Sequence, residues 1–138
     1  MFSFTSVVVL SAVLAGVTAQ IPPTCTRTYT VVPGDICDHI SAKAHSSTFQ
    51  LANANQGVIN DFCGNLSVGQ EICLGLAGSD CTTTTVVSAD RPICLEVAQD
   101  AGIPLETLLH NNPNIDSFCG NIYPGEVLCT SDQLFNYN

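Results

Sequence analysis

Apolar and polar positions in the first part of the chain predict a strand followed by a helix. Residues 26–32 are rich in β-branched and aromatic side chains and end at Pro33 and Gly34, which favour a turn. Asp35 is expected to cap a helix that extends to His45, because its carboxylate can accept a hydrogen bond from the free N–H groups at a helix start. Apolar residues then recur at intervals of four, at Ile36, Ile40 and Ala44. This period predicts one apolar helical face.

A shorter helix and a closing strand are predicted next. Ser47 and Gln50 have the spacing of a capping box, in which each side chain can bond the other residue's exposed N–H. The helix is expected to end before residues 55–57, Asn-Gln-Gly, which favour a break. Residues 69–70 then predict a turn into a strand over residues 71–74.

The second half of the chain repeats this order with different residues. Residues 82–87 consist of Thr and Val and predict a strand. Asp90 or Arg91 is the expected helix cap, and Pro92 is tolerated in the first turn, where a missing N–H costs little. Apolar residues again recur at intervals of four, at Ile93, Val97 and Ala101. Gly102 is expected to end this helix.

A last helix and strand complete the second half. Pro104 opens the helix and Asn112-Pro113 stops it. Three leucines are expected to face inward: Leu105, Leu108 and Leu109. Residues 124–125, Pro-Gly, predict a tight turn before a strand over residues 126–128.

One stretch of sequence occurs twice, at residues 63–73 and 119–129. Both copies read Cys-Gly-Asn, an apolar residue, two variable positions, Gly, Gln or Glu, one more residue, an aliphatic residue and Cys. Such repetition predicts two similar units. We therefore expect a lead-in over residues 20–24, a first domain over 25–76, a linker over 77–80, a second domain over 81–130 and a tail over 131–138.

The start of the chain indicates its compartment. Residues 7–17 are an almost unbroken run of apolar and small residues, and Val-Thr-Ala precedes Gln20. This pattern predicts a secretory signal peptide over residues 1–19. The alternative, a membrane anchor, needs about 20 apolar residues. The sequence therefore predicts a secreted protein, either extracellular or associated with a cell wall, and no membrane partner.

Eight cysteines divide evenly between the two halves. They are Cys25, Cys37, Cys63 and Cys73, then Cys81, Cys94, Cys119 and Cys129. In a short secreted chain this number predicts a disulfide framework, with pairing inside each half. Four cysteines allow three pairings, and the sequence does not choose among them.

The chain is strongly acidic, which limits its partners. Three basic residues stand against twelve acidic ones, giving a formal charge of −9. Because no basic patch is available to neutralise phosphates, nucleic acid and anionic membrane surfaces are poor partners. An uncharged ligand fits better.

Both halves resemble the lysin motif (LysM) domain in its cysteine-bearing fungal form. The residues that carry the resemblance are the Tyr-Thr-Val-Val-Pro-Gly-Asp-Ile-Cys run at 29–37, Asn55, Asn112-Pro113, and the closing stretches at 66–73 and 122–129. The resemblance implies an α+β fold made of two small disulfide-stapled βααβ domains in tandem. In each domain, two helices would cover one face of a two-stranded antiparallel sheet.

The resemblance also implies non-catalytic binding of chitin and N-acetylglucosamine oligomers. Proteins of this plan resemble secreted LysM effectors, which sequester chitin fragments or shield the fungal wall. The sugar would lie between the loop after the first strand and the loop after the second helix. The implied ligand-binding residues are Gly34, Asp35, Ile36, Asn55, Gln56, Gly57 and Val58 in the first half, and Asp90, Arg91, Pro92, Ile93, Asn112, Pro113, Asn114 and Ile115 in the second.

The sequence departs from the family pattern in both predicted grooves. The family usually has Gly-Asp-Thr after the first strand, whereas this chain has Ile36 in place of Thr and no Gly at all in the second copy. An alternative is therefore a disulfide-rich secreted structural or interaction protein with degenerate sugar grooves. A ligand-induced dimer is also left open.

Other chemistry finds little support in the sequence. His39, His45 and His110 lack the spacing of metal ligands, so no metal and no cofactor are predicted. Asp38 and its neighbours could form an acid-base cluster, but the sequence places no second carboxylate opposite them, and we expect no enzyme. Asn65 begins an Asn-Leu-Ser sequon and is a candidate for N-glycosylation.

Overall fold

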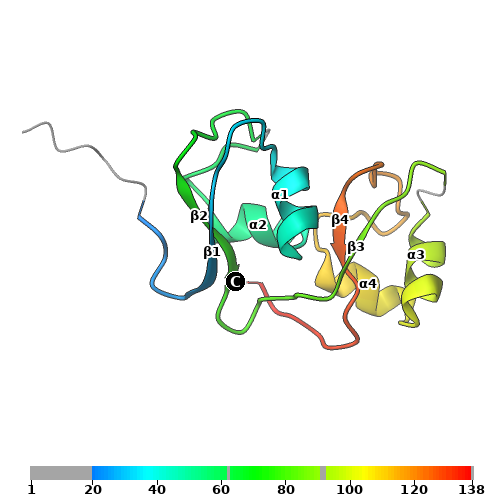
Figure 1. The fold of residues 1–138 in the computed structure, drawn as a ribbon. Helices are drawn as coiled ribbons and strands as arrows, with labels where there is room; N and C mark the ends of the chain where they lie inside the picture. Colours follow the sequence, from blue (N-terminus) through cyan, green and yellow to red (C-terminus); the bar gives the residue numbers. More distant parts are fainter. Residues whose placement is uncertain (1–19, 62, 91–92, 138) are drawn as a thin grey trace, which may run out of the picture.

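The computed structural model describes residues 20–61, 63–90 and 93–137. The predicted signal peptide over residues 1–19 and the predicted ligand-binding residues Arg91 and Pro92 lie outside the described residues. Helices and strands are mixed, as predicted, and the order strand, helix, helix, strand occurs twice (Figure 1). The first unit, residues 25–76, contains β1 (Cys25–Thr30), α1 (Cys37–Ala44), α2 (Thr48–Ala54) and β2 (Glu71–Leu76), and the second unit, residues 81–130, contains β3 (Thr84–Val86), α3 (Cys94–Ala101), α4 (Leu105–Asn111) and β4 (Val127–Cys129).

Each unit holds a two-stranded antiparallel sheet made of its first and last strands. β1 pairs with β2, with Thr28 opposite Cys73. β3 pairs with β4, with Thr85 opposite Leu128. β3 is only three residues long, shorter than the strand predicted over residues 82–87. The second sheet is therefore the smaller of the two.

Asp35 does not cap α1, so that prediction is wrong. The residue before the helix is Ile36, whose side chain makes no capping hydrogen bond. The Asp35 carboxylate instead accepts hydrogen bonds from the Val32 N–H at 2.9 Å and from the Tyr29 hydroxyl at 3.0 Å. The carboxylate closes the turn that follows β1, and the helix begins only after this turn.

Asp90 does not cap α3 either. The residue before that helix is Ile93, which is extended and offers no side-chain cap. The N–H of Asp90 donates to the Ser88 hydroxyl at 3.2 Å, within the loop that precedes the helix. The helix ends where predicted, because Gly102 adopts a left-handed conformation with φ of +70°.

Half of the predicted capping box at α2 is present. Ser47 accepts a hydrogen bond from the Gln50 N–H at 3.1 Å, as expected. The Gln50 side chain does not reach back to Ser47. Its Nε2 donates to the Leu74 carbonyl at 2.8 Å and its Oε1 accepts from the Cys81 N–H at 2.7 Å. Gln50 therefore holds the end of β2 and the start of the second unit.

Each unit has its own apolar core. The first consists of Val31, Ile40, Leu51, Ile72 and Leu74, and the second of Val87, Cys94, Val97, Ala98, Ile103, Leu108, Ile115 and Leu128. Three residues expected on apolar helix faces are exposed: Ile36, Ile93 and Leu105. Each of them precedes or opens its helix, where the regular apolar period does not yet apply. No helix within the described residues is long and apolar enough to cross a membrane.

Two nested disulfides close each unit. They join Cys25 to Cys73 and Cys37 to Cys63 in the first, and Cys81 to Cys129 and Cys94 to Cys119 in the second. Pairing inside each half is thus confirmed, and the structure selects one of the three pairings. The outer bond of each pair joins residues 48 positions apart, a loop for which chain entropy gives about 4 kcal/mol of stabilisation.

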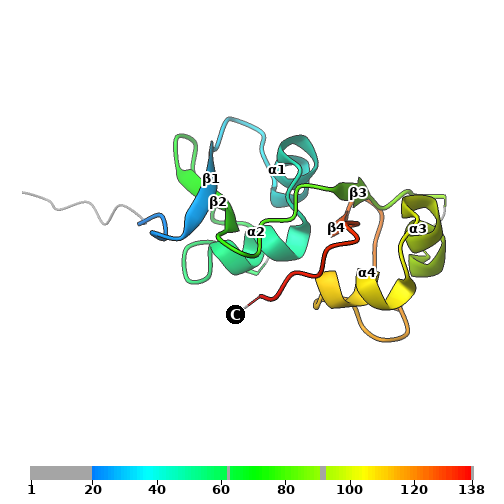
Figure 2. The same cartoon turned by 90° about the horizontal axis from the view of Figure 1, so that it is seen from below.

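The two units pack side by side, with α1 and α2 of the first next to β4 of the second (Figures 1 and 2). Asp80, the last residue of the predicted linker, fixes this junction. Its carboxylate accepts hydrogen bonds from Arg27 at 2.7 Å, from Gln50 at 2.8 Å and from Thr26. Burial on its own would raise the pKa of Asp80, but these hydrogen bonds and the charge of Arg27 outweigh it, and the pKa lies below its ordinary value.

The C-terminal segment, residues 131–137, returns across the second unit to the first (Figure 1). The Asn111 side chain on α4 bonds three backbone groups of this segment: the carbonyls of Ser131 and Gln133, at 3.1 and 2.8 Å, and the N–H of Phe135, at 2.9 Å. The Tyr137 ring then meets Phe49 edge-on, with centroids 5.0 Å apart. Burial raises the pKa of Tyr137 to about 12. The segment is therefore part of the packed structure.

Candidate functional site

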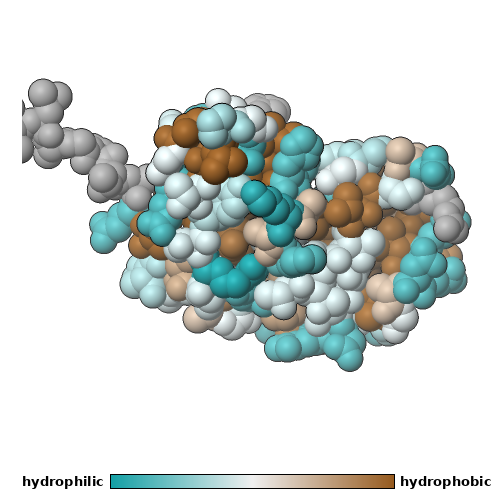
Figure 3. Space-filling view, in the orientation of Figure 1, coloured by the Kyte–Doolittle hydropathy of each residue, from teal (hydrophilic) through white to brown (hydrophobic). Residues whose placement is uncertain are grey.

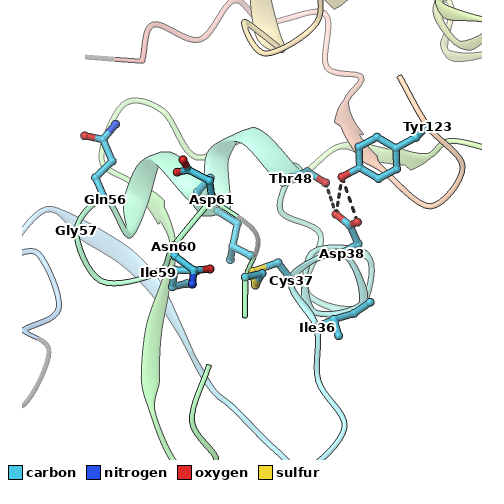
Figure 4. Close-up of a pocket in the computed structure, with 13 residues that line it drawn as sticks. Ile36, Cys37, Asp38, Thr48, Gln56, Gly57, Ile59, Asn60, Asp61 and Tyr123 are labelled. Atoms are coloured by element: carbon cyan, nitrogen blue, oxygen red, sulfur yellow. Dashed lines mark hydrogen bonds between the residues drawn. A yellow bond between two sulfur atoms is a disulfide. The ribbon is translucent and has the colours of Figure 1, made fainter. Parts of the chain in front are cut away.

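A pocket of about 460 Å³ opens on the first unit. Its walls come from the start of α1, the first half of α2 and the loop after α2, and one residue of the second unit completes it (Figure 4). The lining residues are Ile36, Cys37, Asp38, Thr48, Leu51, Ala52, Gln56, Gly57, Ile59, Asn60, Asp61, Cys63 and Tyr123. This volume falls within the range of small-molecule sites, and the lining combines aliphatic side chains, uncharged polar side chains and two aspartates.

The loop after α2 is fixed by two asparagines. Gly57 turns the chain there with φ of +74°, a conformation that favours glycine. Asn65 accepts a hydrogen bond from the Asn60 N–H and donates to the Val58 carbonyl, both at 2.9 Å. Asn60 in turn accepts from the Gly64 N–H at 2.8 Å. The pocket wall is therefore held in place before any ligand binds, while glycosylation of the exposed Asn65 stays a prediction.

Tyr123 reaches this pocket from the second unit (Figure 4). Its hydroxyl donates to the Asp38 carboxylate at 3.1 Å. Thr48 donates to the same carboxylate at 2.9 Å and accepts from the Val127 N–H at 3.0 Å. Burial, together with the negative charge of Asp38 and the hydrogen bond to it, raises the pKa of Tyr123 to about 12. The phenol is therefore protonated at neutral pH and remains a donor.

The predicted residues of the first groove separate into two groups. Ile36, Gln56 and Gly57 line the pocket. Gly34 and Val58 are absent from its lining, and Asp35 is engaged in the turn described above. Three of the seven predicted residues are thus brought together, at the entrance to α1 and just after α2.

Asn55 and Asn112 are buried, and their side chains bond the backbone of their own unit, so their contact with a ligand stays a prediction. The side chain of Asn55 donates to the Leu51 and Cys73 carbonyls and accepts from the Cys73 N–H. The side chain of Asn112 makes the same three bonds, with Leu108 and Cys129. Each asparagine ties the end of its second helix to its last strand.

The other described residues predicted for the second groove lie in different surroundings. Ile115 is buried in the core of the second unit. Asn114 donates to Glu126 at 2.6 Å. Pro113 borders a different hollow, beside Tyr137. Asp90 and Ile93 are exposed on the loop before α3.

Sequence reasoning missed most of the pocket wall. The lining residues that were not predicted to bind a ligand are Cys37, Asp38, Thr48, Leu51, Ala52, Ile59, Asn60, Asp61, Cys63 and Tyr123. Asn60 and Asp61 belong to the same loop as Gln56 and could have been found by extending that loop. The sequence contains one indication that Tyr123 is unusual: it takes the place of Ser67 when the two repeated stretches are aligned.

Two carboxylates, Asp38 and Asp61, line the same pocket, an arrangement that the sequence did not reveal. Asp38 accepts hydrogen bonds from two hydroxyls, whereas Asp61 is exposed. Among the described residues, no group of three or more His, Cys, Asp or Glu side chains could hold a metal ion. The pocket therefore offers hydrogen-bond acceptors and apolar contacts.

Comparison with known proteins assigns residues 29–75 of the chain to a domain family. Residues 29–75 match the LysM domain, and these residues contain all of the pocket except Tyr123. A protein of Penicillium expansum named a non-secreted LysM effector is 31% identical over 129 residues, which are 88% of this chain and 9% of that protein. A protein of Pochonia chlamydosporia (strain 123) named a secreted LysM effector is 31% identical over 111 residues, which are 79% of this chain and 16% of that protein.

Among solved structures, the spore cortex-lytic enzyme SleL of Bacillus megaterium QM B1551 aligns with 80% of this chain and 23% of its own, at 19% identity and a TM-score of 0.39. Because both the identity and the TM-score are low, this likeness says nothing about the function of this protein. The chain spans less than a fifth of the length of the two LysM effectors above. It contains a LysM domain at residues 29–75 and is homologous to fungal LysM effectors.

Proposed function

We propose that this protein binds chitin and N-acetylglucosamine oligomers, without catalysis, in the pocket of the first unit. The observation that carries the proposal is the position of the pocket inside the LysM domain, between the start of α1 and the loop after α2. An N-acetyl sugar needs partners for its hydroxyls and amide and a small apolar contact for its methyl group. Gln56 and Asn60 supply the first, and Ile36 and Ile59 the second.

The overall charge supports the same ligand class. With a formal charge of −9, the protein disfavours anionic polymers, whereas chitin is uncharged. The Asp38 and Asp61 carboxylates at the pocket would repel phosphates and uronic acids but can accept hydrogen bonds from sugar hydroxyls. These charges favour a neutral saccharide as the ligand.

Ile36 and Ile93 provide a matched pair for testing the site. Both precede the first helix of their unit and both are half exposed, at 49% and 50%, but only Ile36 lines the pocket. Isothermal titration with chitin hexamer should show about fivefold weaker binding for Ile36→Ala, if the contact contributes about 1 kcal/mol, and no change for Ile93→Ala. Equal affinities in all three proteins would place the site elsewhere.

A specificity control uses insoluble polymers. The intact protein should be retained on chitin and should pass through cellulose, which lacks the acetamido group. Retention on neither polymer would favour the alternative of a disulfide-rich structural or interaction protein. Retention on both would indicate binding that does not depend on the amide.

Catalysis is the rival function that the two pocket carboxylates raise. A glycosidase needs one carboxylic acid free to donate a proton to the leaving oxygen and a second carboxylate across the bond. Asp38 is instead the acceptor of two hydroxyl hydrogen bonds. Prolonged incubation with colloidal chitin should release no soluble oligomers. Release that is lost in both Asp38→Asn and Asp61→Asn would establish hydrolysis.

The second unit is proposed as a second LysM domain whose own groove no longer binds sugar. Its order of elements, its nested disulfides and the role of Asn112 match the first unit. Burial of Ile115 and the bond of Asn114 to Glu126 favour a degenerate groove. Titration should therefore give one ligand per chain, and light scattering of the saturated protein reports any ligand-induced dimer.

Secretion and an effector or wall-shielding role form the last part of the proposal. The four disulfides favour an oxidising compartment, while the two relatives are named as secreted and non-secreted. Mass spectrometry of the protein from culture medium should give an N-terminus at Gln20. Recovery only from inside cells, with residues 1–19 retained, would contradict secretion.

A further inference from the structure

Tyr123 is an aromatic residue at the rim of a pocket that otherwise belongs to the first unit. No other aromatic side chain occurs among the described lining residues, and Tyr123 as a residue is 42% exposed. Tyr123 lies in the turn before β4, more than forty residues beyond the end of the LysM match at residue 75. The pocket wall is therefore completed by a residue of another unit.

The position of the ring is set by hydrogen bonds across the boundary between the units. The phenol donates to Asp38, and Asp38 is itself held by the hydroxyl of Thr48. Thr48 is fixed from the second unit by the Val127 N–H. The space-filling view shows the two halves of the molecule joined in one continuous surface (Figure 3), and the close-up shows the Tyr123 ring beside Asp38 and Thr48 (Figure 4). The ring is thus oriented without a ligand, which lowers the entropy cost of binding.

The repeated stretches show that this aromatic residue is particular to the second copy. Ser67 stands at the equivalent place in the first unit, and its N–H bonds Gln70, as the N–H of Tyr123 bonds Glu126. The backbone turn is therefore the same in both copies, and it requires no aromatic side chain. The aromatic ring of Tyr123 is therefore not needed to form this turn.

We infer that Tyr123 is a ligand-contacting residue of the first unit's pocket, and that its ring packs on the apolar face of a pyranose of the bound oligomer. The second unit thereby acts as a wall of the first unit's site. This inference rests on the proposed function. An aromatic face suits the C–H groups of a sugar ring, and the remaining lining offers only aliphatic and polar groups for that contact.

Three substitutions test the inference by titration with chitin hexamer. Tyr123→Ala removes the ring and should weaken binding by about tenfold, whereas Tyr123→Phe keeps the ring and should stay within about threefold of the wild type. The matched control is Tyr137→Ala, which removes the other tyrosine at the boundary, where it contacts Phe49 away from the pocket. That variant should bind as the wild type does.

The outcomes separate the inference from the proposed function. A wild type that does not bind overturns both. Binding by the wild type with equal affinity in Tyr123→Ala overturns the inference alone, and equal weakening in Tyr123→Ala and Tyr137→Ala overturns it in favour of loosened packing between the units. In the wild-type complex, nuclear Overhauser effects should connect the Tyr123 ring protons to ligand protons, and their absence would also overturn the inference whether or not the variants fold.

Discussion

The two units share one scaffold and use it differently. In both, an asparagine at the end of the second helix makes three bonds, one to a carbonyl of that helix and two to the cysteine of the last strand. They measure 2.6 to 2.8 Å around Asn55 and 2.8 to 2.9 Å around Asn112. In both, an asparagine after the cysteine of the repeated stretch fixes the loop that precedes it, Asn65 in the first and Asn121 in the second. The repeated residues are therefore mainly structural.

The loop after the second helix is where the units diverge. From the buried asparagine to the next cysteine it runs over residues 55–63 in the first unit and 112–119 in the second, so it is one residue shorter in the second. Ile59 and Ile115 occupy equivalent places before the cysteine, yet Ile59 lines the pocket and Ile115 is buried in the core. The first loop therefore differs from the second in its length and in the exposure of its isoleucine. The two units diverge at this loop, while each keeps a closed apolar core.

The shared scaffold predicts the largest effects. Asn55→Ala and Asn112→Ala each leave two carbonyls and one N–H without their side-chain partner in a buried place, at about 1–3 kcal/mol for each group. We expect each variant to lose at least about 3 kcal/mol of unfolding free energy in guanidinium titrations with the disulfides intact. Asn136→Ala, an exposed control, should change it by less than about 0.5 kcal/mol. Similar losses at all three positions would contradict a structural role for the buried pair.

The segments that follow β2 and β4 are each held by one polar side chain of a helix, which allows a second comparison of the two units. Gln50 on α2 holds the start of the second unit, and Asn111 on α4 holds the C-terminal segment. Gln50→Ala should cost about 1–3 kcal/mol, because it leaves the buried Cys81 N–H without its side-chain acceptor, while the Leu74 carbonyl keeps the Ser46 hydroxyl as a donor. Asn111→Ala should cost less, since residues 131–137 can detach and expose their backbone groups to water.

Hydrogen exchange distinguishes these two variants. In Asn111→Ala, faster exchange should be confined to residues 131–137, with the rest of the protein protected as in the wild type. In Gln50→Ala, exchange should increase on both sides of the junction between the units. Global acceleration in Asn111→Ala would show that the C-terminal segment is needed for the second unit to fold.

The arrangement of helices and strands was largely predictable from the sequence, because period-four apolar positions and Pro-Gly turns are local signals. The details at helix starts were not. Asp35 is a residue type that often caps helices, but its carboxylate can also close the turn before the helix. In the structure it does the latter, accepting hydrogen bonds from the Val32 N–H and the Tyr29 hydroxyl. Gln50 matches a capping box in sequence, but its side chain bonds the Leu74 carbonyl in β2 and the Cys81 N–H at the start of the second unit.

The candidate site was predictable only in part, for a related reason. Loop residues such as Gln56 follow from the order of elements, whereas burial of Asn55 depends on a strand that returns about eighteen residues later. Tyr123 comes from a separate unit, and its approach to Asp38 depends on the packing of the units, which a linear pattern does not contain. The difference between Ser67 and Tyr123 in aligned repeats was the one available signal.

The smallest predicted effect concerns Gln70 and Glu126, equivalent residues that accept from the backbone at the same turn. Burial raises the pKa of Glu126 above its ordinary value of 4.5, and its hydrogen bonds with Asn114 and Tyr123 offset this only in part. The folded protein therefore holds this proton more tightly than the unfolded chain. Stability contributed by the protonated form is present below pH 4.5 and is lost as the pH rises through the raised pKa.

Glu126→Gln gives the second unit the residue of the first and removes the buried charge. The Asn114 amide can turn to present its oxygen to the new amide, so no hydrogen bond need be lost. We expect a modest gain in unfolding free energy at pH 7, smaller than any loss above, that disappears below pH 4.5, where the wild-type carboxyl is neutral too. Unfolding titrations of both proteins between pH 4 and pH 8 measure this. A gain of equal size at every pH would mean that packing, and not the charge, separates the two units at this position.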